Sequence, residues 1–546
     1  MLKYIAISGT TSVTHNMYVY ETEKEMLVVD CGVGFPDLNT RGVDLIIPDF
    51  SYVVKNKNKL VGLLLSHGHE DHVGATPYLL REANVPVWST KLVSAFLEDK
   101  LSDAGIGNAK LNVFNELADE FDIGSFHVNS FRTTHSIPET QGFAIDTPEG
   151  RVFHIPEHKI DQEPVVGKAF DAERIKALAA KGALFLASDS LRSNVPGITP
   201  KETQIEDNLE KVAKDAQGAI FFTAISSNIG RFKQAMSVAK KLRRKICFIG
   251  FSIKRKCMIA RDLNYLDFDD NFELHFKEAL KKDKREMFYI VGGCFGQPGS
   301  SLERLSNNDH FKAKVEKGDM VIISQDPAPP YTKEAQNAMV DNFFDMGADV
   351  HYYELDDGLY VSGHGSQGDI VKLFDLVKPK YISPVGGTIR FMKGYTKLAQ
   401  ANGFEKDRIF ELKPGENIEF SRGSAKRGEK VQVRPVYVDG TGIGDVGRVV
   451  LQERETLSKG GVVVAVVRLR NGKVSELPEI FTKGFVFEKI NKKLLQEASR
   501  LLDKKLRDTS KRDKRSLSAV TEEALGQYMF SRLERRPLII PVVLEN

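Results

Sequence analysis

The sequence predicts an α/β fold made of three kinds of segment, and three observations support this prediction. Residues 1–201 are rich in short apolar runs typical of β-strands, with few helical patterns between them. Residues 202–358 instead alternate apolar strands with helical segments, which is the pattern of a parallel sheet covered on both faces. After a polar stretch at 421–435, residues 436–546 mix strands with basic helical sequence, as expected of a small α+β domain.

The first part is predicted to form sheet layers with helices outside. Strands outnumber helices there, and several strands are spaced closely enough to form hairpins. A helical pattern lies at residues 74–83. The predicted strands are residues 3–8, 26–32, 61–66, 85–90, 126–131, 142–147, 151–156 and 183–190.

The second part is predicted to form its own sheet, after which the sequence returns to the style of the first part. The runs 381–387 and 408–420 show this return. Segment 421–435 is polar, charged and glycine-bearing, so we predict a linker there. The strands predicted for the second part are residues 218–224, 245–251, 287–293 and 319–324.

Composition indicates a globular protein of several domains. A chain of 546 residues is too long for one ordinary core, and 41% hydrophobic with 28% charged residues excludes a disordered chain. The net charge is only +3, so a polyanionic partner would have to meet local patches of charge. We interpret the basic clusters at 240–245, 281–286 and 503–515 as solvated helix faces.

Cysteine usage and hydropathy predict a cytoplasmic protein. The four cysteines form no CxxC pair and no disulfide framework, which favours reduced thiols. The N-terminal residues carry no apolar signal region. We find no apolar run of the roughly 18 residues that a membrane-spanning helix needs, and we expect no membrane association.

The motif LLLSHGHEDHVGA at residues 63–75 predicts a metal site. Three histidines and Asp71 fall within six positions after an apolar strand, although the whole chain has only 12 histidines. Such a cluster arises by chance in roughly one chain in a hundred. Imidazole and carboxylate ligands together suit zinc or manganese. The candidate ligands in this motif are His67, His69, Asp71 and His72.

Further candidate ligands follow other predicted strands of the same part. His135 and Glu157 each come directly after an apolar run, and Asp30 and Asp189 each end one. Any one of them alone is more simply explained as an ordinary loop residue. Because strand ends meet at sheet edges, carboxylates there could orient ligand imidazoles or carry protons.

These motifs resemble a known family over essentially the whole chain. SHGHEDHVGA matches the HxHxDH signature of the metallo-β-lactamase fold. The chain resembles the β-CASP branch of that fold, and within it bacterial ribonuclease J, in TTHSIPETQGFAIDTPEG, SDSLRSNVPGITP and YVSGHGSQGDIVKLFDLVKPKYISPV. Its C-terminal part resembles the C-terminal domain of that family in VYVDGTGIGDVGRVVLQERETLSKGGVVV and RLERRPLIIPVV.

The resemblance implies a particular domain plan and two metal ions. Residues 1–201 and 359–420 would form a four-layer αββα metallo-β-lactamase domain, with residues 202–358 inserted as the β-CASP domain. A linker at 421–435 would lead to the α+β domain at 436–546. Two divalent ions, zinc or manganese, are expected: one would be held by His67, His69 and His135, the other by Asp71 and His72, with Glu157 at the bridging position.

Two departures from the family pattern affect the metal site. Glu157 stands where the family has an aspartate, and Gly386 stands where it has a histidine that serves the second ion. No histidine follows His364 in the sequence, so the C-terminal part offers no substitute imidazole. His158 is near in sequence, but on an extended segment it would point away from the side of Glu157. We therefore expect weak, exchangeable binding of the second ion.

The resemblance also implies catalytic and RNA-binding residues. Asp71, Asp189 and His364 would be catalytic, with His364, oriented by Asp189, either donating a proton to the leaving oxygen or stabilising the charged transition state. An RNA 5′-phosphate pocket would be formed by Ser227, Asn228, Ser362, His364 and Ser366. Gly230 and Phe251 replace a histidine and an arginine of the family pattern, so less charge is expected near that phosphate.

The expected function is a metal-dependent ribonuclease of RNA decay and processing, acting as a 5′–3′ exonuclease and an endonuclease. RNA is the expected partner, and a homodimer, a homotetramer or a hetero-oligomer with a paralogue is the expected assembly. One alternative is a weakly active or inactive RNA-binding paralogue that partners an active ribonuclease J. A small-molecule hydrolase would not need the inserted domain, and DNA as substrate stays open.

Overall fold

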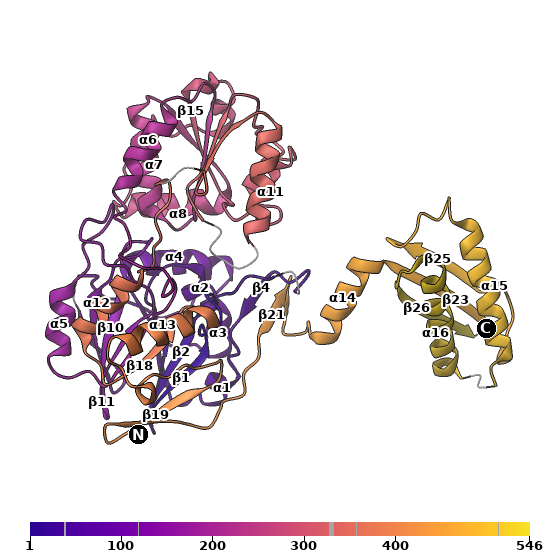
Figure 1. Ribbon diagram of the computed structural model, residues 1–546, viewed down its shortest axis with the longest axis horizontal. Coiled ribbons are helices and arrows are strands. Elements are labelled where there is room, and N and C mark those ends of the chain that lie inside the picture. The colour runs from indigo at the N-terminus through magenta and orange to yellow at the C-terminus, as the bar shows by residue number, and fades with distance from the viewer. Residues whose placement is uncertain (38–39, 118, 327–331, 356–357, 511–512, 546) are drawn as a thin grey trace. The chain divides into compact units, whose positions relative to one another are not determined.

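The computed structural model describes residues 1–37, 40–117, 119–326, 332–355, 358–510 and 513–545 (Figure 1). By their contacts the residues form two units: Met1–Phe35 with Ile46–Val436, and Pro36–Leu45 with Tyr437–Asn546. Within the described ranges, none of the helices combines the length and the apolar character that crossing a bilayer requires.

The first unit contains two large sheets at the centre of its metallo-β-lactamase-like part. The first sheet has the order β20-β19-β1-β2-β3-β5-β6-β7 and the second has the order β18-β12-β11-β10-β9-β8. The first is formed by β1 (Leu2–Ser8), β2 (Met17–Glu21), β3 (Met26–Val29), β5 (Leu60–Leu64), β6 (Val87–Ser89), β7 (Leu111–Val113), β19 (Asn417–Ser421) and β20 (Ser424–Arg427). The second is formed by β8 (Glu120–Ile123), β9 (Phe126–Arg132), β10 (Gln141–Thr147), β11 (Gly150–Ile155), β12 (Phe185–Asp189) and β18 (Tyr381–Val385).

The two sheets pack face to face through an aromatic core. Tyr4, Tyr18 and Tyr20 of the first sheet share one buried cluster with Phe143 and Phe185 of the second. The rings of Tyr4 and Phe185 lie 4.9 Å apart between centroids. Because strand side chains alternate between faces, the opposite face of each sheet also needs cover. Burial of one large side chain in the core between the sheets contributes about 1.5–3 kcal/mol to the free energy of unfolding.

Helices cover the two outer faces, which gives the predicted αββα layers. Apolar side chains of α5, α12 and α13 share a second buried cluster with β10, β11 and β12. Figure 1 shows α5 and α12 on one side of the sheets and α1 and α3 on the other. The helices of this part are α1 (Ser51–Lys55), α2 (Glu70–Val73), α3 (Thr76–Glu82), α4 (Lys91–Asp103), α5 (Ala172–Ala179), α12 (Gln367–Val377) and α13 (Ile389–Ala401).

The inserted part is a five-stranded parallel sheet with the order β14-β15-β13-β16-β17. Separate buried clusters lie on its two faces, as expected for a parallel sheet covered by helices. Its strands are β13 (Ile220–Thr223), β14 (Lys245–Ile249), β15 (Met287–Val291), β16 (Met320–Ile323) and β17 (Asp349–Tyr352). Its helices are α6 (Gln204–Ala213), α7 (Ile229–Lys241), α8 (Phe251–Asp262), α9 (Phe276–Ala279), α10 (Ser301–Ser306) and α11 (Thr332–Asp345).

Ion pairs hold the inserted part against α4 and the start of α2. Arg255 of α8 pairs with Asp99 and, at 2.8 Å, with Asp103, both on α4. Glu70 accepts from Lys100 of α4 at 2.7 Å and from Lys256 of α8 at 3.1 Å. Burial opposes ionisation of Glu70, but the two lysines outweigh it and lower the pKa of this carboxyl to about 2.

A buried charge network links α7 to the start of the insertion. The Arg231 side chain is fully buried, pairs with Glu202 at 2.5 Å and donates to the Ser324 carbonyl at 2.8 Å. Lys159 also pairs with Glu202, at 2.6 Å. Burial raises the pKa of Glu202, but Arg231 and Lys159 together lower it below its ordinary value.

We expect Arg231→Met to lower the free energy of unfolding by about 3–5 kcal/mol, because Glu202 loses its main partner in a buried place. Urea unfolding at neutral pH measures this change, and Arg231→Met with Glu202→Leu should recover part of it. The contribution of Glu202 is present above its unfolded pKa of 4.5 and is lost as the pH falls through the lower folded value. The difference from wild type should therefore shrink in acid; a pH-independent difference would contradict this account.

The second unit combines the C-terminal residues with a short segment from near the N-terminus. The Asp44 amide donates to the Val438 carbonyl at 2.9 Å, and the Gly440 amide donates to the Asp44 carboxylate at 2.7 Å. Its main sheet has the order β24-β23-β25, and β26 pairs in parallel with β23. Its elements are β21 (Val436–Asp439), β22 (Gly442–Ile443), α14 (Arg448–Gly460), β23 (Val462–Arg470), β24 (Lys473–Val474), β25 (Glu479–Lys483), α15 (Lys492–Asp508), α16 (Lys514–Leu533) and β26 (Leu538–Glu545). A further three-stranded sheet has the order β22-β21-β4, with β4 at Leu45–Ile47.

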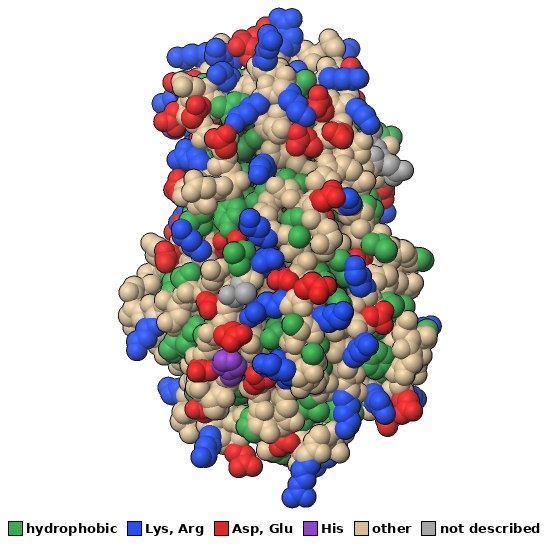
Figure 2. Space-filling view, turned by 90° about the vertical axis from the view of Figure 1, so that its left-hand side faces the viewer, with side chains coloured by type: hydrophobic (Ala, Val, Ile, Leu, Met, Phe, Trp, Pro, Cys, Tyr) green, Lys and Arg blue, Asp and Glu red, His purple; other side chains and the backbone are tan. Residues whose placement is uncertain are grey.

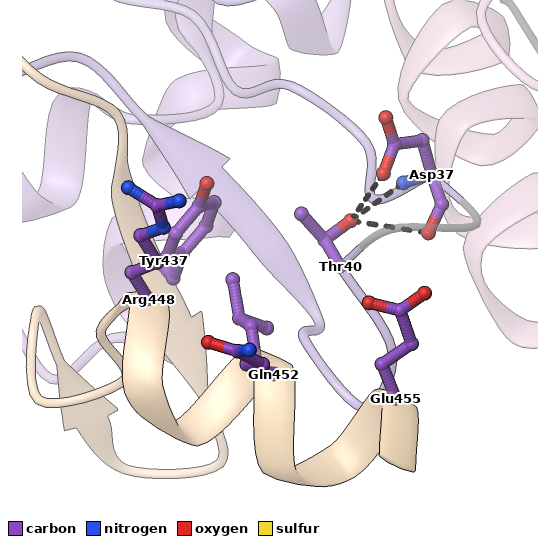
Figure 3. Close-up of a pocket in the computed structure, with 7 residues that line it drawn as sticks. Asp37, Thr40, Tyr437, Arg448, Gln452 and Glu455 are labelled. Carbon is purple, nitrogen blue, oxygen red and sulfur yellow. Dashed lines mark hydrogen bonds between the residues drawn. The ribbon is translucent and has the colours of Figure 1, made fainter. Parts of the chain in front are cut away.

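The second unit also contains a cavity of about 620 Å³ (Figure 3). In it, the Thr40 hydroxyl donates to the Asp37 carboxylate at 3.1 Å. The lining residues are Asp37, Thr40, Tyr437, Arg448, Leu451, Gln452 and Glu455. None of them is a predicted site residue.

Two boundaries differ from the sequence prediction. The linker predicted at 421–435 is wrong for its first half, because β20 pairs with β19 and extends the edge of the first sheet. Residues 36–45, assigned by sequence to the first domain, belong by their contacts to the C-terminal unit. In both places backbone hydrogen bonds, which leave no apolar pattern, determine the structure.

Candidate metal centre and active site

The candidate ligands lie at the carboxyl ends of strands from both sheets. The HxHxDH motif starts in the loop after β5, and its aspartate and last histidine lie within α2, which begins at Glu70. The loops after β9 and β11 carry His135 and Glu157. Gly32, after β3, permits close contact with α2, since a Cβ there would lie 1.5 Å from the Asp71 carbonyl oxygen. Strand direction thus gathers residues that are far apart in sequence.

The first ligand group consists of three imidazoles and one carboxylate: His67, His69, His135 and Glu157. Nδ1 of His69 lies 3.2 Å from Nε2 of His67 and 3.1 Å from Nε2 of His135. Oε2 of Glu157 lies 2.9 Å from the His67 nitrogen and 2.7 Å from the His135 nitrogen. The four donor atoms therefore face a common point.

The second ligand group consists of Asp71, His72 and Glu157. Nε2 of His72 lies 3.1 Å from Oε1 of Glu157 and 3.5 Å from Oδ2 of Asp71. Glu157 thus directs one oxygen to each group, which is the arrangement expected of a bridging carboxylate. Its extra methylene relative to aspartate does not remove it from either group.

Neighbouring polar groups fix the orientation of the ligand rings. The His72 Nδ1–H donates to Asp30 at 2.7 Å, and the Ser66 hydroxyl, which donates to Asp30 at 2.9 Å, lies 2.9 Å from Nδ1 of His67. The His135 Nδ1–H donates to the Gly363 carbonyl at 2.7 Å. In each ring the other nitrogen is left free to face the group, as in known metal sites.

The donor atoms fit divalent cations because they do not satisfy one another. Oε2 of Glu157 is buried and makes no hydrogen bond of acceptable geometry, although two ring nitrogens lie within 3 Å of it. A buried carboxylate oxygen without a donor is costly unless a cation occupies the space it faces. Three imidazoles and a carboxylate suit zinc or manganese, and the second group is richer in oxygen.

The electrostatics of the protein without metal favour cation binding at the first group, whereas at the second group His72 must first release a proton. Burial lowers the pKa of His67 to about 4 and lowers the pKa of His69 well below its ordinary value, so both rings are neutral near pH 7. Burial raises the pKa of the Asp71 carboxyl to about 7. Although burial alone would lower the pKa of His72, the carboxylates of Glu157 and Asp30 raise it well above its ordinary value. Neutral imidazoles are the form that binds metal.

His364 lies beside the first group and is oriented by Asp189. Its Nδ1–H donates to the Asp189 carboxylate at 2.7 Å, and its ring centroid lies 4.8 Å from that of His135. Burial opposes protonation, but Asp189 and then Glu157 raise the pKa of His364 to about 9. The ring is therefore a cation at neutral pH and can donate a proton from Nε2.

Two of the predicted phosphate-binding residues, Asn228 and Ser366, cap the N-termini of helices. Asn228 is the N-cap of α7, and its Oδ1 accepts from the Arg231 amide at 3.0 Å. Ser366 is the N-cap of α12, and the Ser362 hydroxyl oxygen accepts from the His364 amide at 3.1 Å. Ser227 directly precedes Asn228 and is buried. The sequence did not single out Arg192, whose Nη2 lies 3.3 Å from the Ser366 hydroxyl.

Gly386 directly follows β18, whose last residue, Val385, pairs with Asp189 of β12. Its φ of 66° lies in the left-handed region, and a Cβ there would lie 3.3 Å from the Pro156 carbonyl oxygen and 3.5 Å from Oδ1 of Asp189. The position is close to the centre but supplies no side-chain ligand. His158 is buried and outside both ligand groups, and both its ring nitrogens lack hydrogen-bond partners.

Asn16 also lies at the second group, although no sequence pattern predicted it there. Its Nδ2 is 3.1 Å from Nε2 of His72 and 3.4 Å from Oδ2 of Asp71. The residue precedes β2 at the end of the polar loop GTTSVTHN, which carries no motif that would mark it.

The fold and the ligand groups define a metallo-β-lactamase-type hydrolase with a β-CASP insertion. A family model described as "Metallo-beta-lactamase superfamily" matches residues 10–158. "Ribonuclease J, beta-CASP domain" matches residues 217–343, and "Ribonuclease J C-terminal domain" matches residues 449–546. The chain belongs to the ribonuclease J family.

Full-length relatives support this assignment. Ribonuclease J2 of Bacillus subtilis (strain 168) is 32% identical, with 100% of this chain and 98% of the relative covered. Ribonuclease J 1 of Streptococcus pyogenes serotype M3 is 33% identical, with 99% and 97% covered. A crystal structure of a protein of unknown function from Enterococcus faecalis V583 shares the fold, with a TM-score of 0.53 at 14% identity over 76% of this chain and 99% of that chain.

Proposed function

We propose that this protein is a metal-dependent ribonuclease that hydrolyses phosphodiester bonds of RNA, from the 5′ end and internally, in RNA decay and processing. The observation that carries the proposal is the placement of Glu157 between two ligand groups, with one oxygen toward each. Relatives that match over the full length and are named ribonuclease J support RNA as the substrate. Four buried free thiols support a reducing compartment, the cytoplasm.

The proposed catalytic residues act around this centre. Divalent ions at such sites polarise phosphoryl oxygens and make water a nucleophile near neutral pH. His67, His69, His135 and Glu157 would hold one ion, and Asp71, His72 and Glu157 the other. Asp189 holds the His364 ring through Nδ1, so that Nε2 is positioned to protonate the leaving oxygen or to stabilise the charged transition state.

RNA would have to bind at local patches of basic side chains, because the net charge of the chain is small. On the face shown in Figure 2, basic and acidic side chains are interspersed, in keeping with the small net charge of +3. We assign the 5′-phosphate contact to Ser227, Asn228, Ser362, His364 and Ser366. The proposed assembly is a homodimer, a homotetramer or a hetero-oligomer with a paralogue.

The alternative is an RNA-binding paralogue with little activity, and Gly386 is the observation that favours it. The test is degradation of a labelled RNA by the purified protein with added manganese or zinc, with Asp71→Ala as the control. Metal-dependent degradation that Asp71→Ala abolishes supports catalysis. RNA binding without degradation at any metal concentration would instead support the alternative.

We expect only a weak preference for a 5′-monophosphate, below about tenfold in kcat/KM over a 5′-hydroxyl RNA. Gly230 has no side chain to contact a phosphate, and Phe251 at the start of α8 is 76% exposed and apolar. One lost charged hydrogen bond accounts for about 1.5–3 kcal/mol of such discrimination. Phe251→Arg should raise the preference. A strong monophosphate preference in the wild-type protein would show that other residues, such as Arg192, supply the charge.

A further inference from the structure

Because position 386 is a glycine, the second ligand group lacks the imidazole that the family pattern has there. The Asn16 side chain lies close enough to this group to take the place of that ligand. Asn16 is fully buried and directly precedes β2. Its side-chain amide contacts both residues that belong to the second group alone: 3.1 Å from Nε2 of His72 and 3.4 Å from Oδ2 of Asp71. The other imidazole nitrogen of His72 donates to Asp30, so Nε2 is the atom available to a metal.

The distances within this set are those of ligands that share one ion. Bonds of about 2.0–2.2 Å place neighbouring tetrahedral ligands roughly 3.3–3.6 Å apart, and octahedral ones roughly 3 Å apart. Nε2 of His72 lies 3.5 Å from Asp71, 3.1 Å from Glu157 and 3.1 Å from the Asn16 amide. The amide therefore lies as close to the His72 nitrogen as the carboxylate ligands of this group do.

Without metal the Asn16 NH₂ group faces His72 and Asp71, and the hydrogen bonds on its far side permit the opposite orientation. The Tyr18 hydroxyl lies 2.8 Å from Oδ1 of Asn16 and 2.9 Å from the Gly9 carbonyl oxygen, but its single proton can serve only one of them. If the amide rotates by 180°, Tyr18 donates to Gly9 and accepts from the Asn16 NH₂ group. The amide oxygen then faces the ligand group.

The rotation gives up two long hydrogen bonds of the Asn16 NH₂ group, to the Asp71 carbonyl at 3.2 Å and to the Val13 carbonyl at 3.5 Å, and it gains an ion ligand. The Asp71 carbonyl still accepts from the Asn16 backbone amide at 2.9 Å. A neutral hydrogen bond of this kind contributes about 1 kcal/mol net. An NH₂ group directed at a cation would be repelled, whereas an amide oxygen is a common ligand of hard divalent ions.

The same hydrogen-bond chain reaches the position that lacks the histidine. The Gly386 amide donates to the Gly9 carbonyl at 2.8 Å, and this carbonyl also accepts from Tyr18. Tyr18 and Gly386 therefore share the Gly9 carbonyl oxygen, and the Tyr18 hydroxyl contacts the Asn16 side chain. The Asn16 amide enters the second group next to the end of β18, where the missing imidazole would have been attached.

We propose that the Asn16 side-chain oxygen is the fourth protein ligand of the second ion, in place of an imidazole at position 386. This inference rests on the proposed two-metal function. The second site then has three oxygen ligands and one nitrogen ligand, against three nitrogens and one oxygen in the first. Oxygen-rich sites suit Mn²⁺ or Mg²⁺, so the two sites differ in chemistry and the second takes manganese.

The test measures Mn²⁺ binding to the full-length protein in the absence of RNA, by native mass spectrometry and calorimetry. We expect two ions in the wild type. Asn16→Ala should keep the first ion and bind the second at least about 10-fold more weakly. Asn16→Asp, which keeps an oxygen at this position, should bind two ions at least as tightly as the wild type. Asn129→Ala removes another buried asparagine, on β9, and should match the wild type.

A second variant separates ligation from a structural role. Gly386→His in the Asn16→Ala background should restore the second ion, because histidine is tolerated in the left-handed region better than most residues. Thermal melting followed by circular dichroism shows that each variant is folded. Equal affinity for the second ion in Asn16→Ala and the wild type would overturn the inference, as would loss of that ion in Asn16→Asp. A wild-type protein that binds one ion would also overturn it, whereas one that binds none would overturn the proposed function itself.

Discussion

Glu157→Ala is expected to weaken the binding of both metal ions, because this single carboxylate directs one oxygen to each ligand group. Loss of an orienting neighbour weakens metal binding about 10–100-fold, and loss of a shared ligand should exceed that range for the second ion. The first ion keeps His67, His69 and His135 and should be affected less. Metal content after gel filtration, measured by inductively coupled plasma mass spectrometry, reports both changes.

Glu157→Asp is the matched variant for this experiment. It keeps the charge, shortens the side chain by one methylene and supplies the residue that the family pattern has at this position. We expect it to retain both ions. If Glu157→Ala kept both ions while Asp71→Ala lost the second, Glu157 would not be a bridging ligand.

His364→Ala is expected to lower kcat for RNA hydrolysis by about 10²–10⁴-fold and to leave the metal content unchanged. The His364 ring lies beside His135, and its Nδ1–H donates to Asp189 at 2.7 Å. Single-turnover kinetics with a 5′-labelled RNA measure the chemical step directly. Asp189→Asn, which keeps the size of the side chain, should lower kcat by a smaller factor because the ring loses its orientation.

A change in KM alone would contradict this role for His364. His364 also belongs to the proposed 5′-phosphate pocket. A circular RNA, which has no 5′ end and can be cut only internally, therefore separates the two roles. We expect the loss in kcat to persist with that circular substrate. A defect confined to substrates with a 5′-phosphate would assign His364 to binding and leave the leaving oxygen without a proton donor.

Most strands could be predicted because their apolar runs are long enough to be seen in isolation. The strand β2 was missed although all five of its residues are buried. Its tyrosines and Glu21 interrupt the apolar pattern, and their polar atoms are satisfied by distant residues: Tyr20 lies 3.0 Å from Nδ1 of His154, and Glu21 pairs with Lys59 at 2.8 Å. Such partners cannot be read from a local window of sequence.

The β19–β20 hairpin was missed for a different physical reason. Residues 424–427 lie at the edge of the first sheet and are mostly exposed. An edge strand is held by backbone hydrogen bonds on one side and needs few apolar side chains, so its composition resembles that of a linker.

The ligands of the loop after β5 could be predicted from the sequence. The way in which residues from other strands complete the site could not. His67, His69, Asp71 and His72 stand together in sequence, and His135 and Glu157 follow recognisable strands. Their convergence depends on the strand order of two sheets, which only the resemblance implied. Asn16 lies 55 residues before Asp71 and carries no motif, so its place at the second group follows from the structure alone.

The segment 36–45 makes the C-terminal region hard to remove cleanly. This segment begins six residues after Asp30, and its backbone pairs with the backbone around residue 438. The chain then rejoins the first unit before α1 begins. A chain truncated at residue 436 would leave the Asp44 amide and carboxylate without the partners that they have at Val438 and Gly440. Removing residues 437–546 would therefore also disrupt the segment near the N-terminus. The properties of such a shortened protein would reflect both changes.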